Sequence, residues 1–462
     1  NNFTPCSLLR APCFFHLRPI IFLRTFLIFP SENFYDNLRP MEKDRRKIII
    51  SWCLYDWANS AFATTIMAAV LPVFYSSVAG ANLSKTTASS YWGYTNTIAM
   101  LLVAFSAPLL GAMADHGGIK KKFLAAFALL GIFSTACLFF VERGEWFLAS
   151  FLYILGMLGF SGGNNFYDSL LPHVAGEEEI DRISSFGYAL GYLGGGLLLA
   201  FNLAMIMRPA FFGIADAEWA ARYSFLTVGV WWGIFSIPIM KNVPEPSVVP
   251  IPGESSQIFK AGLQRLSSTF HNLRKYKEAF KFLVAFWLYN DGIGTIISMA
   301  VIFGAEINIP QEHLIGAILA VQFVGIPFSI LFGRLAGLIG AKRAIFLGLV
   351  VYTIISLGGY FIQTALHFWI LAIMVGFVQG GTQALSRSLF GAMIPKSRSA
   401  EFFSFYDVSS KFAGIIGPFV FGLVGQLTGS SRLSVVALII FFIGGGLILA
   451  TVNEKEGKKA AF

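Results

Sequence analysis

Long apolar runs, broken only by short polar clusters, constrain this chain more than any other feature. A helix needs about 20 mostly apolar residues to cross the hydrocarbon core of a bilayer. Charged residues make up only 13% of the chain, whereas about a quarter is usual in a soluble protein. The sequence therefore predicts an all-α membrane protein with twelve transmembrane helices, in the windows 50–76, 91–114, 123–141, 146–170, 183–207, 222–240, 279–303, 313–333, 344–362, 366–390, 402–427 and 432–451.

Basic residues between the windows predict the topology, because cytoplasmic loops carry an excess of Lys and Arg. One set of loops is rich in basic residues. It begins with the basic cluster at 43–47 and contains the lysines at 120–122, and we include Arg387 among its loop charges. The opposite loops hold few basic residues: Lys85, Arg143, Arg208, Arg222 and Arg432. We expect both termini to be cytoplasmic. The same asymmetry explains the net charge of +9 without a nucleic-acid partner.

The windows divide the chain into an N-terminal bundle (48–240), a linker (241–278), a C-terminal bundle (279–451) and a tail (452–462). Within the linker, apolar residues alternate with Lys and Arg at helical spacing: Phe259, Leu263, Leu266, Phe270 and Leu273. This pattern predicts a basic amphipathic helix on the inner membrane surface, with a solvated linker helix as the alternative.

Residues 1–47 form an N-terminal extension, in which Met41 is the first methionine. We expect residues 1–40 to be translated upstream sequence or disordered. Their arginines and lack of acids before Ser31 would also suit a transit peptide, and an additional span is a weaker alternative because Arg18 and Arg24 interrupt the apolar run.

Two loop motifs show that the chain repeats itself. GAMADHGGIKKK after the second window and GRLAGLIGAKR after the eighth share the pattern G-x-x-x-[D/G]-x-x-G-x-[K/R]-[K/R]. The windows at 183–207 and 402–427 share a Ser-Phe pair, at Ser185 and Ser404. Such internal similarity predicts two six-helix halves in parallel, which form pseudo-symmetric bundles. The first motif consists of Gly111, Asp115, Gly118, Lys120 and Lys121.

Two parallel halves with this loop resemble the major facilitator superfamily over about residues 48–451. YDWANSAF in the first window and GFSGGNNFYDSLLP in the fourth are similar to its autophagy-related vacuolar effluxer branch. The resemblance implies the major facilitator fold and a gate on the inner face to which Asp115 contributes. It also implies a bacterial inner membrane, and amino acids as solute, since the fungal member is linked to amino-acid export from vacuoles. Gly337 replaces the acid in the second motif, which puts a second gating ion pair in doubt.

Ionisable residues inside the windows must face water or one another, because a charge at the bilayer centre costs about 2.5–3.5 kcal/mol. Asp168 and Arg387 lie near the ends of their windows, and neither receives a specific binding role from the sequence. The resemblance places the windows that hold these residues around a central cavity. The predicted substrate or coupling residues are Asp56, Asn59, Asn164, Asn165, Tyr167, Asp291, Gln379, Gln383, Asp407 and Lys411.

Each of these predictions has a structural alternative. Asp56 and Asn59 could tie two helices together rather than gate the cavity, and Asp407 and Lys411 could neutralise each other at i,i+4 spacing. Asp291 precedes two glycines that could bend its helix at a binding site or pack against a neighbour. The Gly-Gly pairs at 162–163 and 380–381 could admit solute to the backbone or allow close helix packing.

The leading functional hypothesis is a secondary transporter of a small polar solute, with amino acids as the solute that the resemblance favours. We expect this transporter to work by alternating access, as a monomer in the bilayer. Coupling to protons is part of the same hypothesis. The chain contains no GxxxxGK[ST] loop for a nucleotide-driven pump and no HExxH motif or other enzyme signature. The four cysteines have no metal-site spacing, so no metal or cofactor is expected. A uniporter, or a non-transporting receptor or scaffold on this fold, remains the alternative.

Overall fold

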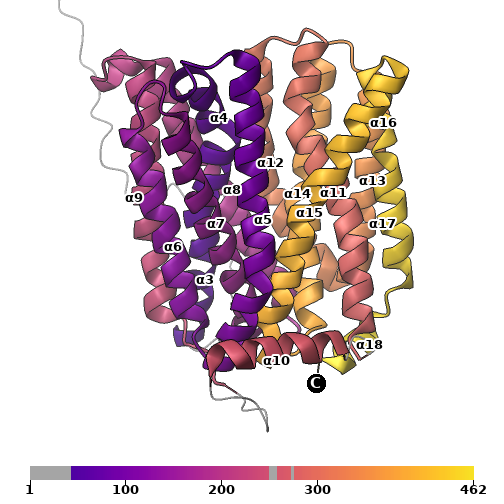
Figure 1. The fold of residues 1–462 in the computed structure, drawn as a ribbon. Coiled ribbons are helices and arrows are strands. Elements are labelled where there is room, and N and C mark those ends of the chain that lie inside the picture. Colours follow the sequence, from indigo (N-terminus) through magenta and orange to yellow (C-terminus); the bar gives the residue numbers. More distant parts are fainter. Residues whose placement is uncertain (1–42, 249–256, 272–274, 462) are drawn as a thin grey trace, which may run out of the picture. The chain divides into compact units, whose positions relative to one another are not determined.

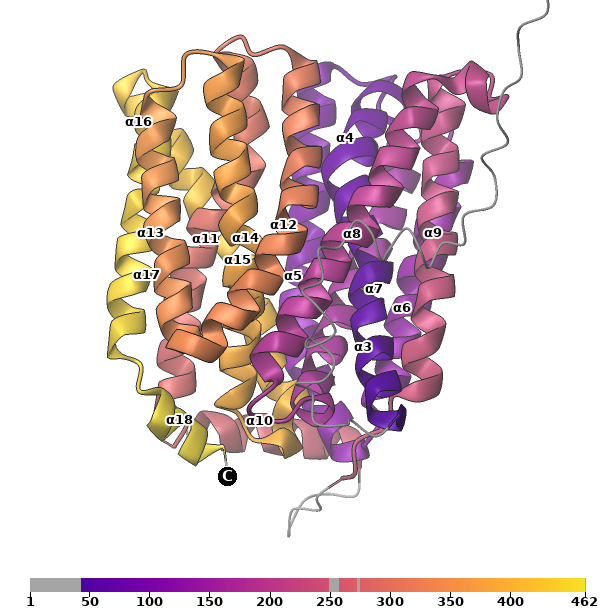
Figure 2. The same ribbon diagram turned by 180° about the vertical axis from the view of Figure 1, so that it is seen from behind.

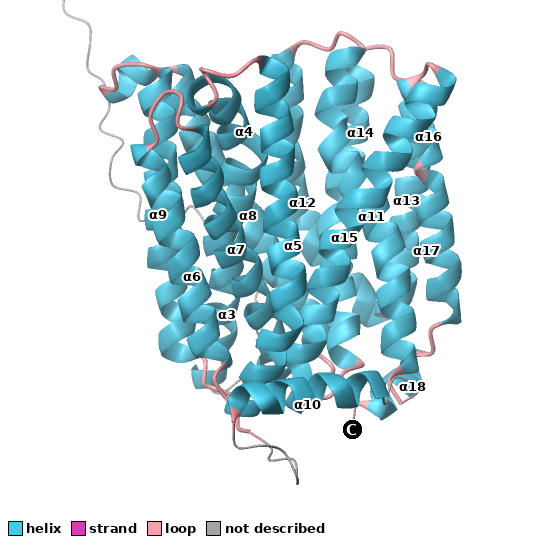
Figure 3. Ribbon diagram, viewed as in Figure 1, coloured by secondary structure: helices cyan, strands magenta, loops and turns pink. Residues whose placement is uncertain are grey.

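The computed structural model describes residues 43–248, 257–271 and 275–461. The residues from Ile48 onward form one compact unit, which is treated by itself below. The predictions for residues 1–40, and for Leu273 in the linker, fall outside the described residues. Those described are helices and the short connections between them, with no strand among them (Figure 3).

The first half contains six spans, one of which is divided into four helical segments. Its elements are α3 (Lys43–Ala61), η1 (Phe62–Ala69), α4 (Val70–Phe74), η2 (Tyr75–Ala79), α5 (Lys85–Gly117), α6 (Lys120–Cys137), η3 (Leu138–Phe140), α7 (Trp146–Val174), α8 (Ile180–Met207), η4 (Pro209–Phe212) and α9 (Ala217–Asn242).

The second half follows the linker helix and ends in a short terminal helix. Its elements are α10 (Ile258–His271), α11 (Lys277–Glu306), α12 (Gln311–Ile339), α13 (Ala341–Tyr360), α14 (Ala365–Ala392), η5 (Lys396–Arg398), α15 (Ser399–Thr428), α16 (Ser431–Ala437), α17 (Ile439–Thr451) and α18 (Glu454–Ala460).

Eleven helices or helical runs in the described residues are long and apolar enough to cross a membrane. The remaining predicted window, 402–427, is α15, a continuous helix whose apolar stretch is the shorter Ile416–Thr428. Polar residues in the first turns of α15 contact the other half of the protein. The twelve predicted windows therefore all correspond to helices.

The two halves stand side by side, and specific helices meet at their boundary (Figures 1 and 2). Helix α5 packs against α15, and α8 packs against α12. By contrast, α6, α9, α13 and α17 turn large apolar side chains outward, as a lipid-facing surface requires: Phe133, Val230, Ile234, Val350, Ile354, Ile440 and Leu447. These four helices therefore supply much of the apolar outer surface of the bundle.

Helix α10 lies across one end of the bundle, close to α18, and this end is called the α10 end below (Figure 1). Its buried face is small or polar, with Ala261, Arg265 and Thr269 against the protein. Phe259 and Leu263, from the predicted apolar stripe, are exposed. The described part of the linker thus contains a helix from which Phe259 and Leu263 point away from the bundle.

The first span is irregular. Two π-helical segments, η1 and η2, flank α4, which contains Pro72. Proline cannot donate a backbone hydrogen bond, and π-helical turns are frequent at functional sites. The hydroxyl of Thr64 in η1 donates to the carbonyl of Gly195 in α8 at 3.1 Å, so the irregular region is held against a neighbouring helix. This region starts at Phe62, three residues after Asn59, and its residues Ala63 and Thr64 line the cavity between the halves that is described below.

Asp291 illustrates how a buried acid can serve packing. Its Oδ1 accepts a hydrogen bond of 2.9 Å from the backbone N–H of Gly417, which joins α11 to α15. A Cβ atom at position 417 would lie 1.9 Å from Thr295 Oγ1 and 3.0 Å from the carbonyl oxygen of Asp291. Glycine is needed here because the two helices approach too closely for any side chain.

Replacing Gly417 with alanine should therefore lower the free energy of unfolding by about 1–3 kcal/mol, the usual cost of overpacking. The matched control is Gly422→Ala in the same helix, because a Cβ at 422 meets nothing within 4 Å. Thermal unfolding of the purified protein in detergent measures both. Equal melting temperatures for the two variants would contradict the close contact.

Candidate solute-binding cavity and gate

A cavity of about 310 Å³ lies between the two halves. Helices α3, α7 and α8 contribute to its wall from the first half, and α11, α12, α14 and α15 from the second. Most of the residues predicted for the site meet here. The predicted polar residues that line it are Asp56, Asn59, Asn164, Gln379, Gln383 and Asp407.

Arg387 forms a charged cluster at one side of this cavity. Its Nη1 lies 3.2 Å from Asp56 Oδ2 and 3.0 Å from Asp168 Oδ1. Its Nε donates to the hydroxyl of Ser184 and its Nη2 to the carbonyl of the same residue, both at 2.9 Å. Arg387 belongs to α14 in the second half, while all three partners belong to the first. The cluster therefore fastens the halves to each other.

Aromatic rings surround the guanidinium of Arg387. Its carbon Cζ lies 4.4 Å from the ring centre of Tyr188, 5.0 Å from Trp52 and 5.5 Å from Tyr167. Tyr167 also donates a hydrogen bond of 2.7 Å to Asp56 and stacks on Trp52 at 4.4 Å. Cation–π contacts of this kind stabilise a desolvated cation. Arg387 is consequently an interior residue with 2% side-chain exposure, and counting it as a loop charge was wrong.

The predicted amides lie on opposite sides of the cavity. Asn59 in α3 donates its side-chain N–H to the side-chain oxygen of Asn164 in α7, which ties these two helices together. Gln379 and Gln383 line the cavity from α14, and Asp407 lines it from α15. The side chain predicted to neutralise Asp407, that of Lys411, lies outside the described residues.

Three predicted residues do not line the cavity: Tyr167, which contacts the Arg387 cluster, and Asn165 and Asp291, which point elsewhere. Asn165 donates a hydrogen bond of 2.8 Å to Ser404 Oγ, at the packed boundary between α7 and α15. Asp291 binds Gly417 and is not among the residues that line the central cavity, although its neighbour Asn290 is. The packing alternative therefore has structural support at both positions.

The Gly-Gly pairs also serve helix packing. Added Cβ atoms would lie 2.5 Å from a ring carbon of Phe127 at position 162, and 2.5 Å from the hydroxyl of Tyr55 at position 163. At 380 and 381, they would lie 2.0 Å from Ser329 Oγ and 2.2 Å from a ring carbon of Phe332. These glycines face neighbouring helices, which favours close packing over direct contact with a solute.

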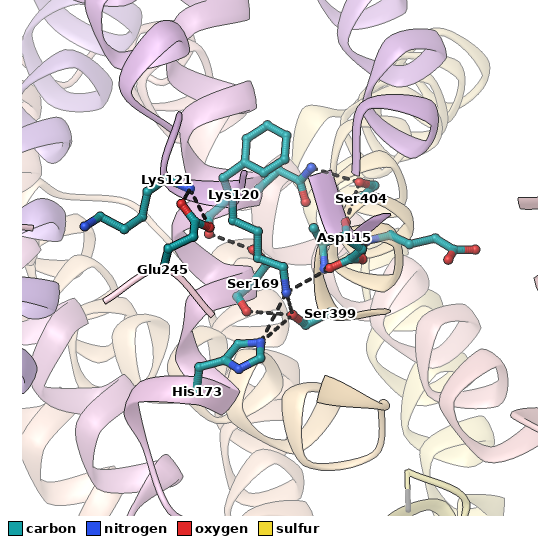
Figure 4. A network of polar contacts seen from close by, with 12 residues as sticks. Asp115, Lys120, Lys121, Ser169, His173, Glu245, Ser399 and Ser404 are labelled. Atoms are coloured by element: carbon teal, nitrogen blue, oxygen red, sulfur yellow. Dashed lines mark hydrogen bonds and ion pairs between the residues drawn. The ribbon is translucent and has the colours of Figure 1, made fainter. Parts of the chain in front are cut away.

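The predicted gate motif forms a second polar network (Figure 4), around the end of α5, a helix that packs against α10. Asp115 accepts backbone hydrogen bonds from Ala400 at 3.2 Å and Glu401 at 2.8 Å, at the start of α15. A carboxylate is favourable at a helix N-terminus, where N–H groups lack partners within the helix. Gly118 ends α5 with a φ of +58°, which glycine adopts without strain. Asp115 of the first half therefore caps α15 of the second half.

Lys120 completes this network. Its ammonium lies 2.8 Å from Asp115 Oδ1, 2.7 Å from Ser399 Oγ and 3.1 Å from His173 Nε2 (Figure 4). An ammonium has three N–H donors, and these three acceptors use them all. Ser399 in turn donates to the carbonyl of Ser169 at 2.8 Å. The network thus joins α5, α6 and α7 to the start of α15.

The neighbouring lysine of the motif contacts the linker. The backbone N–H of Lys121 donates to both carboxylate oxygens of Glu245, at 3.0 and 3.2 Å. Burial raises the pKa of the Glu245 carboxyl above its ordinary value, and the hydrogen bonds from the backbone oppose this shift. This contact holds the beginning of the linker at the N-terminal end of α6.

The second copy of the motif behaves differently. Lys342 donates to the backbone carbonyls of Ala450 at 2.9 Å and Val452 at 2.7 Å, both within the second half. At Gly337, which stands in place of the acid, an added Cβ would meet nothing within 4 Å. The first motif therefore links the two halves through its acid, Asp115. The second motif has glycine at the equivalent position, which is why the sequence put a second gating ion pair in doubt.

The charged cluster contains residues that were not among the predicted substrate or coupling residues. Asp168 and Arg387 stood out as ionisable residues within spans, which was the available signal. Ser184 and Tyr188 gave none, because Ser and Tyr are common in membrane helices. Only the fold shows that these residues meet across the boundary.

Comparison with known proteins identifies relatives over most of the chain. Two matches to the family model "Vacuole effluxer Atg22 like" cover residues 44–180 and 177–462. The "Uncharacterized MFS-type transporter YxiO" of Bacillus subtilis is 39% identical over 413 residues, which are 88% of this chain and 94% of that protein. Autophagy-related protein 22 of Yarrowia lipolytica is 25% identical over 80% of this chain and 76% of its own.

Solved structures share the fold. The proton:xylose symporter XylE aligns with a TM-score of 0.69 and 15% identity, over 90% of this chain and 97% of its own. The Escherichia coli fucose:proton symporter FucP aligns with a TM-score of 0.65 and 12% identity, over 88% and 98%. The protein is thus a multi-pass membrane transporter and not an enzyme. It belongs to the vacuole effluxer Atg22-like family of the major facilitator superfamily.

Proposed function

We propose that this transporter carries a small polar solute with an amino group, most simply an amino acid, by alternating access through the central cavity. The observation that supports this most directly is a polar cavity between the halves, with the Arg387 cluster at its wall. Asp56 and Asp168 offer acceptors for an ammonium group, and Arg387 offers donors for a carboxylate. The amides of Gln379 and Gln383 supply further hydrogen bonds.

An apolar cavity of about 150 Å³ in the second half suits part of such a solute. It is lined largely by Ile, Leu, Val and Phe side chains, and it shares Gln322 and Gln379 with the central cavity. Ligand sites typically combine apolar walls with a few placed polar groups. The two cavities together favour a solute with a charged head and an apolar side chain.

The α10 end is the cytoplasmic side in this proposal, in the inner membrane of a bacterium. The basic residues of the chain gather in the loops on that side, in accordance with the positive-inside rule. The Asp115 network and the Arg387 cluster both join the halves toward this end, which supports the proposal that these contacts close the cytoplasmic side. Protons are proposed as the coupling ion, because carboxylates line the path.

Transport assays with the full chain in proteoliposomes test the proposal. Efflux of radiolabelled amino acids, sugars and organic acids should be saturable for amino acids and should depend on the proton gradient. Gln383→Met, nearly isosteric, should lower transport by about tenfold, the loss expected from one hydrogen bond to a charged group. Gln363→Met is the control, because Gln363 is exposed outside the cavity. Binding without flux of any solute would instead identify a receptor, and flux that ignores the gradient would identify a uniporter.

A further inference from the structure

We propose that the apolar cavity of the second half selects the solute by the size of its side chain. The cavity admits one hydrocarbon group of up to about the size of a benzene ring, and two small residues in its wall, Ala300 and Ala372, set this limit. This inference rests on the proposed function, because it takes the head group of the solute to be bound in the central cavity. The apolar part is tested separately below.

The wall of this cavity offers almost no polar partner. The cavity measures about 150 Å³, and Thr295, Gln322 and Gln379 are the polar residues among those that line it. The hydroxyl of Thr295 donates to the backbone carbonyl of Asp291 at 2.7 Å, so its donor is already used within α11. Water is poorly held in an apolar space, whereas a space of this volume and lining accommodates a small hydrocarbon.

The matching part of the first half is filled by aromatic rings. According to the internal repeat, the first, second and fourth spans correspond to α11, α12 and α14, which line the cavity. Tyr75, Trp92 and Tyr153 come from these three spans of the first half, and Trp92 lies 5.1 Å from Tyr75 and 4.7 Å from Tyr153 between ring centres. Protein interiors are normally close-packed. An open space in only one copy of a repeat therefore favours a ligand site over ordinary packing.

The apolar cavity adjoins the central one but is built differently. Gln322 and Gln379 line both cavities, so a solute held in the central cavity can extend its side chain between these two amides. The residues that line the apolar cavity all belong to the second half, whereas both halves line the central cavity. Alternating access moves the halves largely as rigid bodies. The second half can therefore hold the same side chain in both states of the carrier.

Two alanines provide the room for that side chain. Ala300 in α11 and Ala372 in α14 line the cavity, and both are half-buried, so a larger side chain at either position would project into the space. Each methylene buried in an apolar site raises affinity about fourfold, which corresponds to about 0.8 kcal/mol. Affinity should therefore rise with the length of the side chain, and filling the cavity should abolish this rise.

Protection of a cysteine in the cavity wall measures occupancy directly. Ala300→Cys is introduced into the full chain, with the native cysteines replaced by alanine, and its reaction with methyl methanethiosulfonate is followed in nanodiscs. The probes are straight-chain 2-amino acids from alanine to norleucine, and uncharged alcohols with the same hydrocarbon tails. For both series, we expect the concentration for half-protection to fall about fourfold with each added methylene. With Ala372→Phe added, norleucine should protect about tenfold less well or worse, as expected when roughly two methylenes lose their site.

Matched variants separate the possible outcomes. Ile370→Phe adds a ring to the same helix at a residue that is 48% exposed and does not line the cavity, so it should leave protection unchanged. Protection that does not grow with chain length in either series would overturn the proposal. Native protection in the Ala372→Phe chain would do the same. The chain-length series needs no filled cavity, so it decides the matter even where Ala372→Phe fails to fold.

The two series also distinguish this inference from the proposed function. Dependence on chain length with the alcohols alone would support the apolar site and contradict an amino acid as the solute. Saturable flux of amino acids in proteoliposomes, with no preference for longer side chains, would leave the proposed function intact and contradict selection by this cavity.

Discussion

Replacing Arg387 with methionine should lower the free energy of unfolding by about 3–5 kcal/mol. The substitution keeps much of the side-chain volume but leaves Asp56 and Asp168 without their shared cation in the interior. It also leaves the hydroxyl and carbonyl of Ser184 without the donors that now contact them. Chemical or thermal unfolding in detergent, at a pH well above the ordinary carboxyl pKa, measures the loss.

Arg143→Met is the matched control for this measurement. Arg143 also pairs with a carboxylate, Glu218, at 3.0 Å, but its side chain is 65% exposed. Exposed ion pairs contribute about 0–1 kcal/mol, because water solvates both charges when the pair is absent. Comparable losses for the two variants would show that the Arg387 cluster is solvated and does not fasten the halves.

The positions of the spans follow from the sequence, because a membrane imposes a simple rule on length and polarity. The predicted window 146–170 lies within α7, and the window 222–240 lies within α9. Polar residues inside the spans were also recognisable as candidate site residues, since most positions in a membrane-spanning helix are apolar. Asn59, Gln383 and Asp407 were selected on this basis, and each lines the cavity.

Partners across the molecule could not be inferred in this way. The spacing around Asp291 suggested a bend at a binding site, yet its partner is a backbone N–H at Gly417 that no local pattern reveals. Arg387 and Asp56 are separated by 331 positions, so their contact depends on how two halves meet. Asp115 is an intermediate case. The motif and the family resemblance indicated a gate, while the residues that it caps, Ala400 and Glu401, required the fold.

The second large effect is expected at Gly111, the first residue of the gate motif. A Cβ atom there would lie 2.2 Å from Ser404 Oγ and 2.4 Å from the carbonyl oxygen of Ala400. The hydroxyl could rotate away, but the carbonyl belongs to the backbone of α15 and cannot. Gly111→Ala therefore forces α5 and α15 apart at the α10 end, where the Asp115 network holds them together.

The cost of overpacking, about 1–3 kcal/mol, falls on the closed state alone, because the two helices separate when this end opens. Gly111→Ala should thus shift the equilibrium toward the open state by about 5- to 140-fold, since 1.4 kcal/mol corresponds to a factor of ten. Spin labels at Lys122→Cys and Arg343→Cys, exposed positions in the first and second halves, measure this shift by double electron–electron resonance in a chain whose native cysteines are replaced by alanine. Gly93→Ala is the control in the same helix, because a Cβ at 93 meets nothing within 4 Å. If Gly111→Ala kept the closed distance and full transport, the contact between α5 and α15 would not be what closes the α10 end.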